Sequence, residues 1–316
     1  MRVLTKSGLH PVLVDVGASG DPPAIWKAIA KQSTYVGFDP DLREMKEGEG
    51  EFYKQIIVNE AITSDASLSS VCFYLTKSPF CSSTLEPDTE ALANYHFHDL
   101  FTVERTATAP AATLGSVLKR VSLDRIDWLK LDTQGTDLRI FTSLPDGIRS
   151  RVLALDVEPG LIDAYKGEDL FVDTHAALLK EGFWLADANI GTAVRVRESS
   201  LKMVTPNKSL QYSYAGRALK KSPAYCEARY FRTLEWMVRG GRDRSEYILL
   251  WSFAMVDGQL GFAMDVALEY HKLFGEDEPG IMMRQESLAR LRARSKVVVP
   301  LIKMKRLLKR MIGRNY

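Results

Sequence analysis

The sequence has 316 residues, enough for one large domain or two ordinary ones, and its hydrophobic fraction of 46% is normal for a soluble globular protein. Its three scattered cysteines form no C-x-x-C pair, which argues against a disulfide framework or a zinc site and leads us to expect a cytoplasmic protein. The net charge of +2 is uneven, because residues 290–316 hold ten Lys and Arg and no acid, which leaves 32 basic against 40 acidic residues in 1–289. The first ten residues have no apolar core, and Ile248–Val256, the longest apolar run, is too short to span a bilayer.

The first chemically informative stretch is Val12–Gly20, which reads V-L-V-D-V-G-A-S-G. It predicts a buried parallel strand, Val12–Val16, that ends in a tight turn of small residues. We expect a helix from Pro22 or Pro23 to Lys31, capped by Asp21, with its amide end toward the same space. The pattern indicates a nucleotide-type cofactor site, although a strand-to-helix turn without a ligand gives the same letters.

The second strand, Tyr35–Phe38, ends at Asp39 and Pro40. Asp39 follows the first turn by about twenty residues, the spacing at which a carboxylate accepts hydrogen bonds from ribose hydroxyls in a doubly wound sheet. An ordinary Asp-Pro turn is the alternative.

Strands and helices alternate through the next 160 residues. The predicted strands are Gln55–Ile62, Ser69–Thr76, Ile126–Leu131, Val152–Val157 and a closing pair, Trp184–Asp187 and Thr192–Val196. The predicted helices are Thr113–Val121 and Asp169–Gly182.

Polar side chains recur where these strands end. They are Asp15, Asp39, Asn59 with Glu60, Asp132 with Gln134, and Glu158. Because ligands of open α/β sheets bind beyond the carboxyl ends of the strands, we expect one composite site there.

Beyond Leu201 the pattern changes. We predict a polar loop over 202–223 and a helical hairpin of Tyr247–Val256 and Gly261–Phe274, followed by breaks at Pro279–Gly280 and Val297–Pro300. A last helix, Leu301–Ile312, places Leu301, Met304, Leu308 and Met311 on one face, surrounded by Lys and Arg. The predicted organisation is therefore a cofactor-binding domain over 1–200, a helical extension over 201–289 that packs on this domain or on a partner chain, and a basic amphipathic tail over 290–316.

Six segments within about residues 10–200 share their order and spacing with a known family. They are V-D-V-G-A-S-G at 14–20, Y-V-G-F-D-P at 35–40, V-N-E-A-I-T at 58–63, T-L-G-S-V-L at 113–118, I-D-W-L-K-L-D-T-Q-G at 126–135 and D-V-E at 156–158. Together they resemble the FkbM family of S-adenosylmethionine-dependent methyltransferases. The resemblance implies the Rossmann-like class I methyltransferase fold, with a mostly parallel seven-stranded sheet, helices on both faces and S-adenosyl-L-methionine at the switch point.

The resemblance also assigns residues to the cofactor. Asp15 and the backbone of Gly17, Ala18, Ser19 and Gly20 would face the methionine moiety and the ribose, and Asp39 would hold the ribose hydroxyls. Asn59, Glu60 and Ala61 would lie near the adenine, with Asp132 and Gln134 below the reactive methyl group. Three positions depart from the family pattern: the turn reads Ser19-Gly20-Asp21, and Gln134 and Gly115 stand where the family has acids.

Methyl transfer from a sulfonium needs alignment and, for a hydroxyl acceptor, a base. Candidate catalytic residues are Asp132 and Glu158, and His96 and His98 of Y-H-F-H-D are weaker candidates because a solvated loop also explains them. Asp132 and Glu158 also have the oxygen ligands of a metal site, but the sequence has no His or Cys cluster and we expect no metal.

The basic tail is typical of a helix on an anionic membrane surface, of a nucleic-acid contact or of a solvated or oligomer-packed terminus. Nucleic acid is disfavoured because Tyr316 is the tail's one aromatic residue. We expect a cytoplasmic or membrane-peripheral methyltransferase that modifies a hydroxyl of a sugar, glycan or other hydroxylated small molecule. A nicotinamide-dependent oxidoreductase, which should show a fuller G-x-G-x-x-G, and a non-catalytic assembly module are the alternatives.

Overall fold

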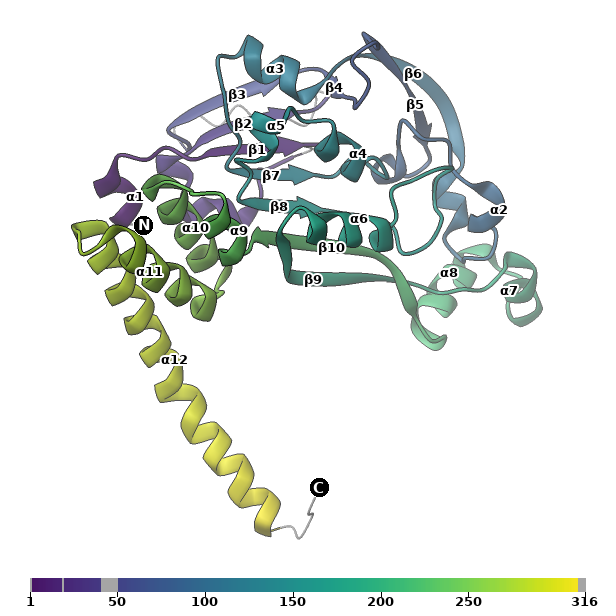
Figure 1. Cartoon of the computed structure of the whole chain (residues 1–316). Helices are drawn as coiled ribbons and strands as arrows, with labels where there is room; N and C mark the ends of the chain where they lie inside the picture. The colour runs from purple at the N-terminus through teal and green to yellow at the C-terminus, as the bar shows by residue number, and fades with distance from the viewer. Residues whose placement is uncertain (1, 19, 41–50, 312–316) are drawn as a thin grey trace. The chain divides into compact units, whose positions relative to one another are not determined.

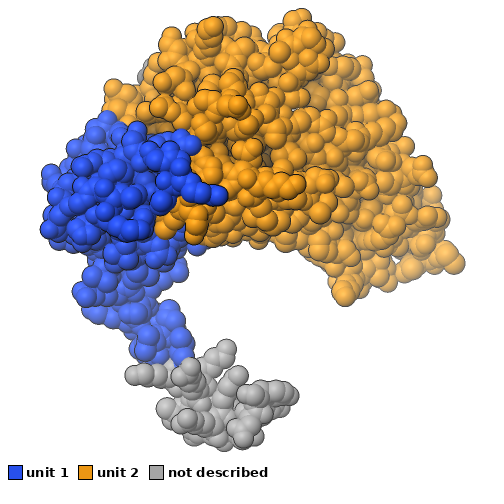
Figure 2. All heavy atoms as spheres, viewed as in Figure 1, with its two compact units in different colours: residues 1–9, 237–316 blue, residues 10–236 orange. Residues whose placement is uncertain are grey.

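The computed structural model describes residues 2–18, 20–40 and 51–311, and it contains two compact units (Figure 2). Residues 10–236 form the first, which we call the sheet unit, and residues 1–9 together with 237–316 form the second, the helical unit. Each is described separately.

The sheet unit is built on a seven-stranded sheet with the order β3-β2-β1-β7-β8-β10-β9 (Figure 1). Its strands are β1 (Val12–Val16), β2 (Thr34–Phe38), β3 (Lys54–Val58), β7 (Trp128–Leu131), β8 (Ala154–Val157), β9 (Phe183–Ala193) and β10 (Ser222–Arg232). The first five are mutually parallel, and β10 runs antiparallel to both of its neighbours. This confirms the predicted Rossmann-like α/β fold with a mostly parallel sheet of seven strands.

Burial explains why these segments are strands. All five residues of β1 and all five of β2 are buried, as expected of parallel strands covered on both faces. Their side chains share one core with apolar residues of the helices α3 (Leu114–Arg120), α4 (Asp137–Thr142) and α6 (Phe171–Lys180). The short helix α5 (Asp146–Arg149) links α4 to β8.

The predicted strand Gln55–Ile62 is instead two strands in two sheets. β3 ends at Val58, and β4 (Ala61–Ile62) joins a second sheet of order β4-β6-β5 with β6 (Val103–Ala112) and β5 (Ser70–Thr76). The chain between β5 and β6 holds the short helices η3 (Pro79–Cys81), α2 (Thr89–Leu92) and η4 (His98–Phe101). Asn59 and Glu60 lie where the chain passes between the two sheets.

The helix predicted from Pro22 or Pro23 to Lys31 is wrong. The segment forms two 3₁₀ helices, η1 (Ala24–Ala28) and η2 (Ala30–Gln32), and Pro23, not Asp21, is at the N-cap of η1. Consecutive prolines lack amide hydrogens, and Pro23 is extended with ψ of 124°. The two short turns are sufficient to bury Trp26 against Tyr35 and Trp128.

The closing pair of strands is also different from the prediction. Residues 183–193 form one continuous strand, β9, whose partner is β10 from beyond residue 200. The turn-like Asn-Ile-Gly at 189–191 lies inside β9. A Cβ on Gly191 would lie 2.1 Å from Cε1 of Tyr225 on β10, so a larger residue would clash with this ring. Gly191 is therefore required by a close cross-strand ring and does not mark a turn.

Residues 202–223 are largely helical, where we predicted a loop. They contain the last three residues of α7 (Glu198–Val204) and all of α8 (Lys208–Ala218). One buried residue from each helix, Leu201 and Ala215, packs with Val194. The sparse apolar positions are too few to produce a readable helical pattern.

The helical unit consists of α1 (Arg2–Ser7), α10 (Arg244–Asp257), α11 (Leu260–Phe274) and α12 (Glu278–Met311), and α9 (Leu234–Arg239) spans the boundary with the sheet unit. This confirms the predicted hairpin of two apolar helices. Asp243 and Glu246 form a capping box at the start of α10, and Gly258, with φ of 85°, caps its end.

The two predicted breaks near the C-terminus do not occur, since α12 runs through both. Pro279 is in the first turn, where its missing amide hydrogen would have no helical partner in any case. Pro300 is in the helix interior, where proline costs about 3 kcal/mol relative to alanine. Over the described residues, no helix combines the length and the apolar character that crossing a membrane requires.

Candidate functional site

The candidate site lies along the carboxyl ends of four neighbouring parallel strands, β2, β1, β7 and β8. Asp39 follows β2, Gly17 follows β1, Asp132 follows β7 and Glu158 follows β8. The chain leaves β1 toward β2 on one side and returns through β7 on the other, so the switch point is between β1 and β7. Ligands bind at such points in open α/β sheets.

The turn after β1 is shaped by glycine and by backbone hydrogen bonds. Gly17 has φ of 82°, and a Cβ there would lie 2.2 Å from the carbonyl oxygen of Asp132. The amides of Gly17 and Ala18 both donate to the carbonyl oxygen of Phe38 at 3.0 Å. These two amides are thus used within the sheet. Ser19 lies outside the described residues, and Gly20 also has a positive φ of 82°.

Asp15 is a buried partner of Lys130 on the adjacent strand. Its carboxylate is 2% exposed and accepts hydrogen bonds from Lys130 Nζ at 2.9 Å and from the Tyr35 hydroxyl at 3.3 Å. Burial raises the pKa of Asp15, and Lys130 opposes this rise. Burial would lower the pKa of Lys130, but Asp15 and Asp132 outweigh it and the pKa is raised. Asp15 therefore acts on the site by holding Lys130, whose Nζ lies 4.0 Å from Asp132 Oδ2.

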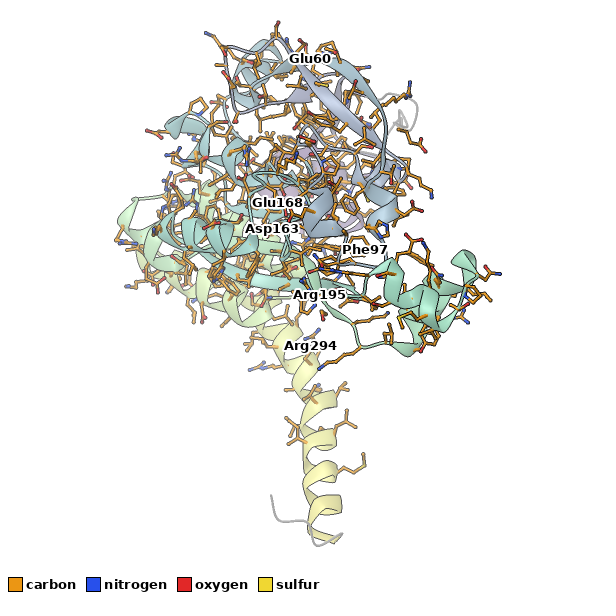
Figure 3. The ribbon with its side chains drawn as sticks, turned by 90° about the vertical axis from the view of Figure 1, so that its right-hand side faces the viewer. Glu60, Phe97, Asp163, Glu168, Arg195 and Arg294 are labelled. Carbon is orange, nitrogen blue, oxygen red and sulfur yellow. The ribbon has the colours of Figure 1, made fainter. Side chains whose placement is uncertain are left out.

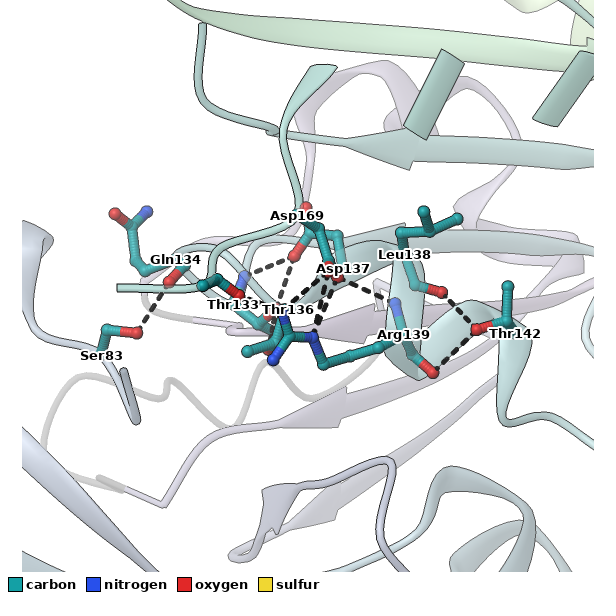
Figure 4. Close-up of polar contacts among 10 residues, drawn as sticks. Ser83, Thr133, Gln134, Thr136, Asp137, Leu138, Arg139, Thr142 and Asp169 are labelled. Atoms are coloured by element: carbon teal, nitrogen blue, oxygen red, sulfur yellow. Dashed lines mark hydrogen bonds and ion pairs between the residues drawn. The ribbon is translucent and has the colours of Figure 1, made fainter. Parts of the chain in front are cut away.

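The loop after β7 is held by Gln134. This residue has φ of 54°, unusual for a non-glycine residue, and its Nε2 donates to Asp132 Oδ1 at 3.0 Å. Its main-chain carbonyl accepts from Ser83 Oγ at 2.7 Å, as Figure 4 shows, and its Oε1 accepts from the Tyr165 hydroxyl at 3.0 Å. An amide can donate to Asp132 where an ionised acid would repel it, which is a physical reason for glutamine at this position.

A second buried carboxylate, Asp137, connects the loop after β7 to the end of β8. It accepts from the amide of Thr133 at 3.0 Å, from the Thr133 hydroxyl at 2.5 Å and from the amide of Glu158 at 2.8 Å. Arg139 on the same helix donates to Asp169, which fixes the far end of the loop after β8 (Figure 4). Asp132 and Glu158 are therefore presented by two loops that are tied together.

The carboxyl group of Glu158, the catalytic candidate at the end of β8, has a perturbed pKa. Burial, followed by the charges of Asp132, Glu227 and Asp137, raises its pKa to about 8, although Lys130 opposes the shift. Within the described part of the chain, the Glu158 carboxylate has no hydrogen-bond partner. At this strand end, the carboxylate could therefore accept a proton or hydrogen bonds from a bound ligand.

Two residues beside Glu158 come from β10. Glu227 accepts from Asn189 Nδ2 at 2.9 Å, and Tyr225, a residue that is 40% exposed, has a bridge pairing with Gly160. Burial raises the pKa of Tyr225, with contributions from Glu158, Glu227 and Asp132. An aromatic ring thus lies next to three carboxylates.

The predicted adenine-side residues are divided between different environments. Asn59 is exposed, Ala61 is buried in the second sheet beside Ala111, and Glu60 forms a two-pronged ion pair with Arg120, at 2.5 and 3.2 Å. Figure 3 shows Glu60 apart from Glu168 and Asp163 in the loop after β8. Asp39 donates its amide to the carbonyl of Val58 at 3.3 Å, which joins the ends of β2 and β3.

His96 and His98 line a separate small hollow together with Glu198 and Tyr212. His96 Nδ1 is 3.3 Å from the carbonyl oxygen of Val194, and His98 Nε2 is 3.7 Å from Glu198. Burial lowers the pKa of His96. Their contacts are with the segments 95–99 and 194–212, and not with the carboxylates at the strand ends.

The sequence reasoning missed Lys130, Tyr165 and Tyr225. A signal existed for Lys130, since a lysine within an otherwise apolar buried strand is rare without a partner. No local pattern signals Tyr165 in the loop after β8, and none signals Tyr225 because β10 is not recognisable as a strand from the sequence. Among the described residues, no group of three or more His, Cys, Asp or Glu side chains is placed to hold a metal ion.

Comparison with known proteins is consistent with this geometry. The family model described as methyltransferase FkbM domain matches residues 36–185, which include Asp39, Asp132 and Glu158. A search of curated proteins gave no match, and a search of solved structures gave none either. The chain therefore contains a methyltransferase domain of the FkbM family.

Proposed function

We propose that the protein transfers the methyl group of S-adenosylmethionine to a hydroxyl of a sugar-like acceptor, with Glu158 as the base. The observation that carries the proposal is the carboxylate of Glu158, which has a pKa of about 8 and accepts no hydrogen bond from any described residue, at the switch-point edge of a methyltransferase domain. A base is effective when its pKa is close to the working pH, and hydroxyl methylation needs such a base.

The residues at this edge fit the proposed cofactor. Asp39 can accept hydrogen bonds from two ribose hydroxyls, and a Cβ on Gly20 would meet no atom within 4 Å, so the turn leaves room beside it. Asp132, together with Glu158 once this carboxyl is ionised, brings negative charge to the same edge, which favours a sulfonium cation. When bound, S-adenosylmethionine would supply an electrophilic methyl group.

The chain's own residues would then position and deprotonate the acceptor. Gln134 and Lys130 hold Asp132, and Asp137 fixes the backbone of Glu158. With the cofactor bound, the acceptor oxygen would take the methyl group in place of sulfur, and the Glu158 carboxylate would take the hydroxyl proton. S-adenosylhomocysteine would be the leaving product, and protonated Glu158 would then release its proton to solvent.

The surroundings of Glu158 support a sugar-like acceptor. Tyr225 presents a partly exposed ring, on which the C–H face of a sugar can pack, and Glu227 offers a carboxylate to neighbouring hydroxyls. The two residues lie on the same strand, β10, across from Glu158 at the end of β8.

Cofactor binding is tested by calorimetry with S-adenosylhomocysteine. We expect Asp39→Ala to weaken binding by about 10- to 100-fold, because hydrogen bonds to a charged group contribute about 1.5–3 kcal/mol. Asp124→Ala, which removes an exposed carboxylate from a loop outside the site, should bind as the unaltered protein does. Undiminished binding by Asp39→Ala would contradict the assignment.

Catalysis is tested by transfer of labelled methyl groups to a panel of mono- and oligosaccharides. Glu158→Gln should lower the transfer rate by about 10²–10⁴ while S-adenosylhomocysteine binding is retained. Because the base must be ionised, the rate of the unaltered protein should rise with pH around a midpoint of about 8. Glu104→Gln, at an exposed site on β6, is the matched control. Equal rates for Glu158→Gln and the unaltered protein would exclude Glu158 as the base.

A further inference from the structure

The second half of α12 has no packing partner among the described residues. Near its start the helix is part of the helical unit, since Met283 and Ser287 are fully buried and Ser287 Oγ accepts from Trp251 Nε1 at 2.8 Å. From Arg292 onward, each described side chain is exposed up to Met304. Figure 3 labels Arg294 at the beginning of this part of the helix.

This exposed part is rich in aliphatic side chains. Six of them, 44–64% exposed, lie within eight residues: Val297, Val298, Val299, Leu301, Ile302 and Met304. The sequence continues the apolar pattern at Leu308 and Met311, seven and ten residues after Leu301, which is the spacing of one helix face. A dense aliphatic surface on a helix without a packing partner indicates a binding surface.

The charge of the same segment identifies the kind of partner. Residues 290–316 contain ten Lys and Arg and no Asp or Glu. A second copy of this helix would bring like charges together, which disfavours self-association. Nucleic acid would match the charge, but residues 290–315 contain no aromatic side chain on which bases could stack, and the aliphatic surface would remain in water.

We propose that α12 from Arg292 to its end binds the surface of an anionic lipid bilayer and thereby places the methyltransferase at a membrane. The aliphatic side chains enter the boundary between head groups and acyl chains, and the Lys and Arg side chains contact anionic head groups. The helix lies on the bilayer and does not cross it. This inference is independent of the proposed reaction.

The test is co-sedimentation of the full chain with phosphatidylcholine vesicles, with and without phosphatidylserine. We expect binding to the anionic vesicles that weakens at high salt, and at least about tenfold weaker binding to the neutral vesicles. Two variants separate the contributions: one carries Val298→Ser, Leu301→Ser and Ile302→Ser, and the other carries Arg292→Gln, Arg294→Gln and Lys296→Gln. Each should weaken binding by at least about tenfold.

The controls use the exposure of these side chains. Both variants should unfold at the same temperature as the unaltered protein, because none of the replaced side chains is buried. Val172→Ser removes a valine that is 67% exposed on α6 and should leave vesicle binding unchanged. Equal binding to neutral and anionic vesicles, or binding that is the same for all variants, would overturn the proposal. So would self-association or nucleic-acid binding through these residues without any affinity for vesicles.

Discussion

The edge of the sheet that carries the site has two halves of different construction. On the β1 and β2 side, backbone groups do the positioning: Gly17 fits against the Asp132 carbonyl, and the Phe38 carbonyl accepts two amides. On the β7 and β8 side, side chains do it, through Gln134, Asp137 and Lys130. We therefore expect substitutions on the first side to change shape and stability, and substitutions on the second side to change charge and pH dependence.

The strongest test of the first half is Gly17→Ala. Its Cβ would lie 2.2 Å from the Asp132 carbonyl oxygen at φ of 82°, so we expect a loss of about 3–4 kcal/mol in the free energy of unfolding, together with loss of S-adenosylhomocysteine binding. Urea unfolding and calorimetry measure the two effects. Gly20→Ala is the matched control: it has the same φ but no atom within 4 Å, and it should cost about 1–2 kcal/mol. Equal losses for the two variants would show that crowding at Gly17 is unimportant.

Glu158, on the β7 and β8 side of the site, should make the stability of the protein depend on pH. The pKa of Glu158 is about 8 in the folded protein and close to 4.5 in the unfolded chain, so its contribution to stability is complete below pH 4.5 and is lost as the pH rises through 8. Glutamine mimics the protonated acid. Glu158→Gln should therefore be as stable as the unaltered protein at pH 4.5 and more stable at pH 9, by about 2 kcal/mol after allowance for solvent screening. Urea unfolding at both pH values measures this, and a stability difference that does not change with pH would refute it.

The smallest expected effect concerns Gln134. Gln134→Glu places an acid beside Asp132 and removes the donated hydrogen bond, which should cost about 1 kcal/mol in unfolding free energy. The added charge should also raise the pKa of Glu158 and shift the midpoint of the pH–rate profile upward. Gln134→Met, which loses the hydrogen bond without adding charge, should destabilise similarly and leave the midpoint in place. A shift of the midpoint in both variants would mean that the loop moves, and that charge is not the cause.

The sequence was a good guide to where strands end and a poor guide to what surrounds their ends. Buried parallel strands are short apolar runs, so Asp39, Asp132 and Glu158 could be placed at the carboxyl ends in advance. The pairing of Asp15 with Lys130 depends on the register between β1 and β7, which lie 115 residues apart in the sequence. No local pattern carries this information.

The errors have local physical causes. Pro22 and Pro23 replace the expected α-helix with 3₁₀ turns. Gly191 looks like a turn residue but makes room for the Tyr225 ring, so β9 was divided in two and its partner β10 was missed. Pro300 looks like a helix end but is tolerated in an exposed helix. Of these residues, Gly191 is the one whose role depends on a distant part of the chain.

The Phe38 carbonyl has a consequence for the speed of ligand binding. Because it accepts the amides of Gly17 and Ala18, hydrogen bonds within the protein hold this part of the turn in shape. Little conformational entropy is then lost in ordering it, and association should proceed in one kinetic phase with a rate proportional to ligand concentration. Gly17 and Ala18 are in this sense a rigid template, and we expect any slow step on ligand binding to come from another segment of the chain.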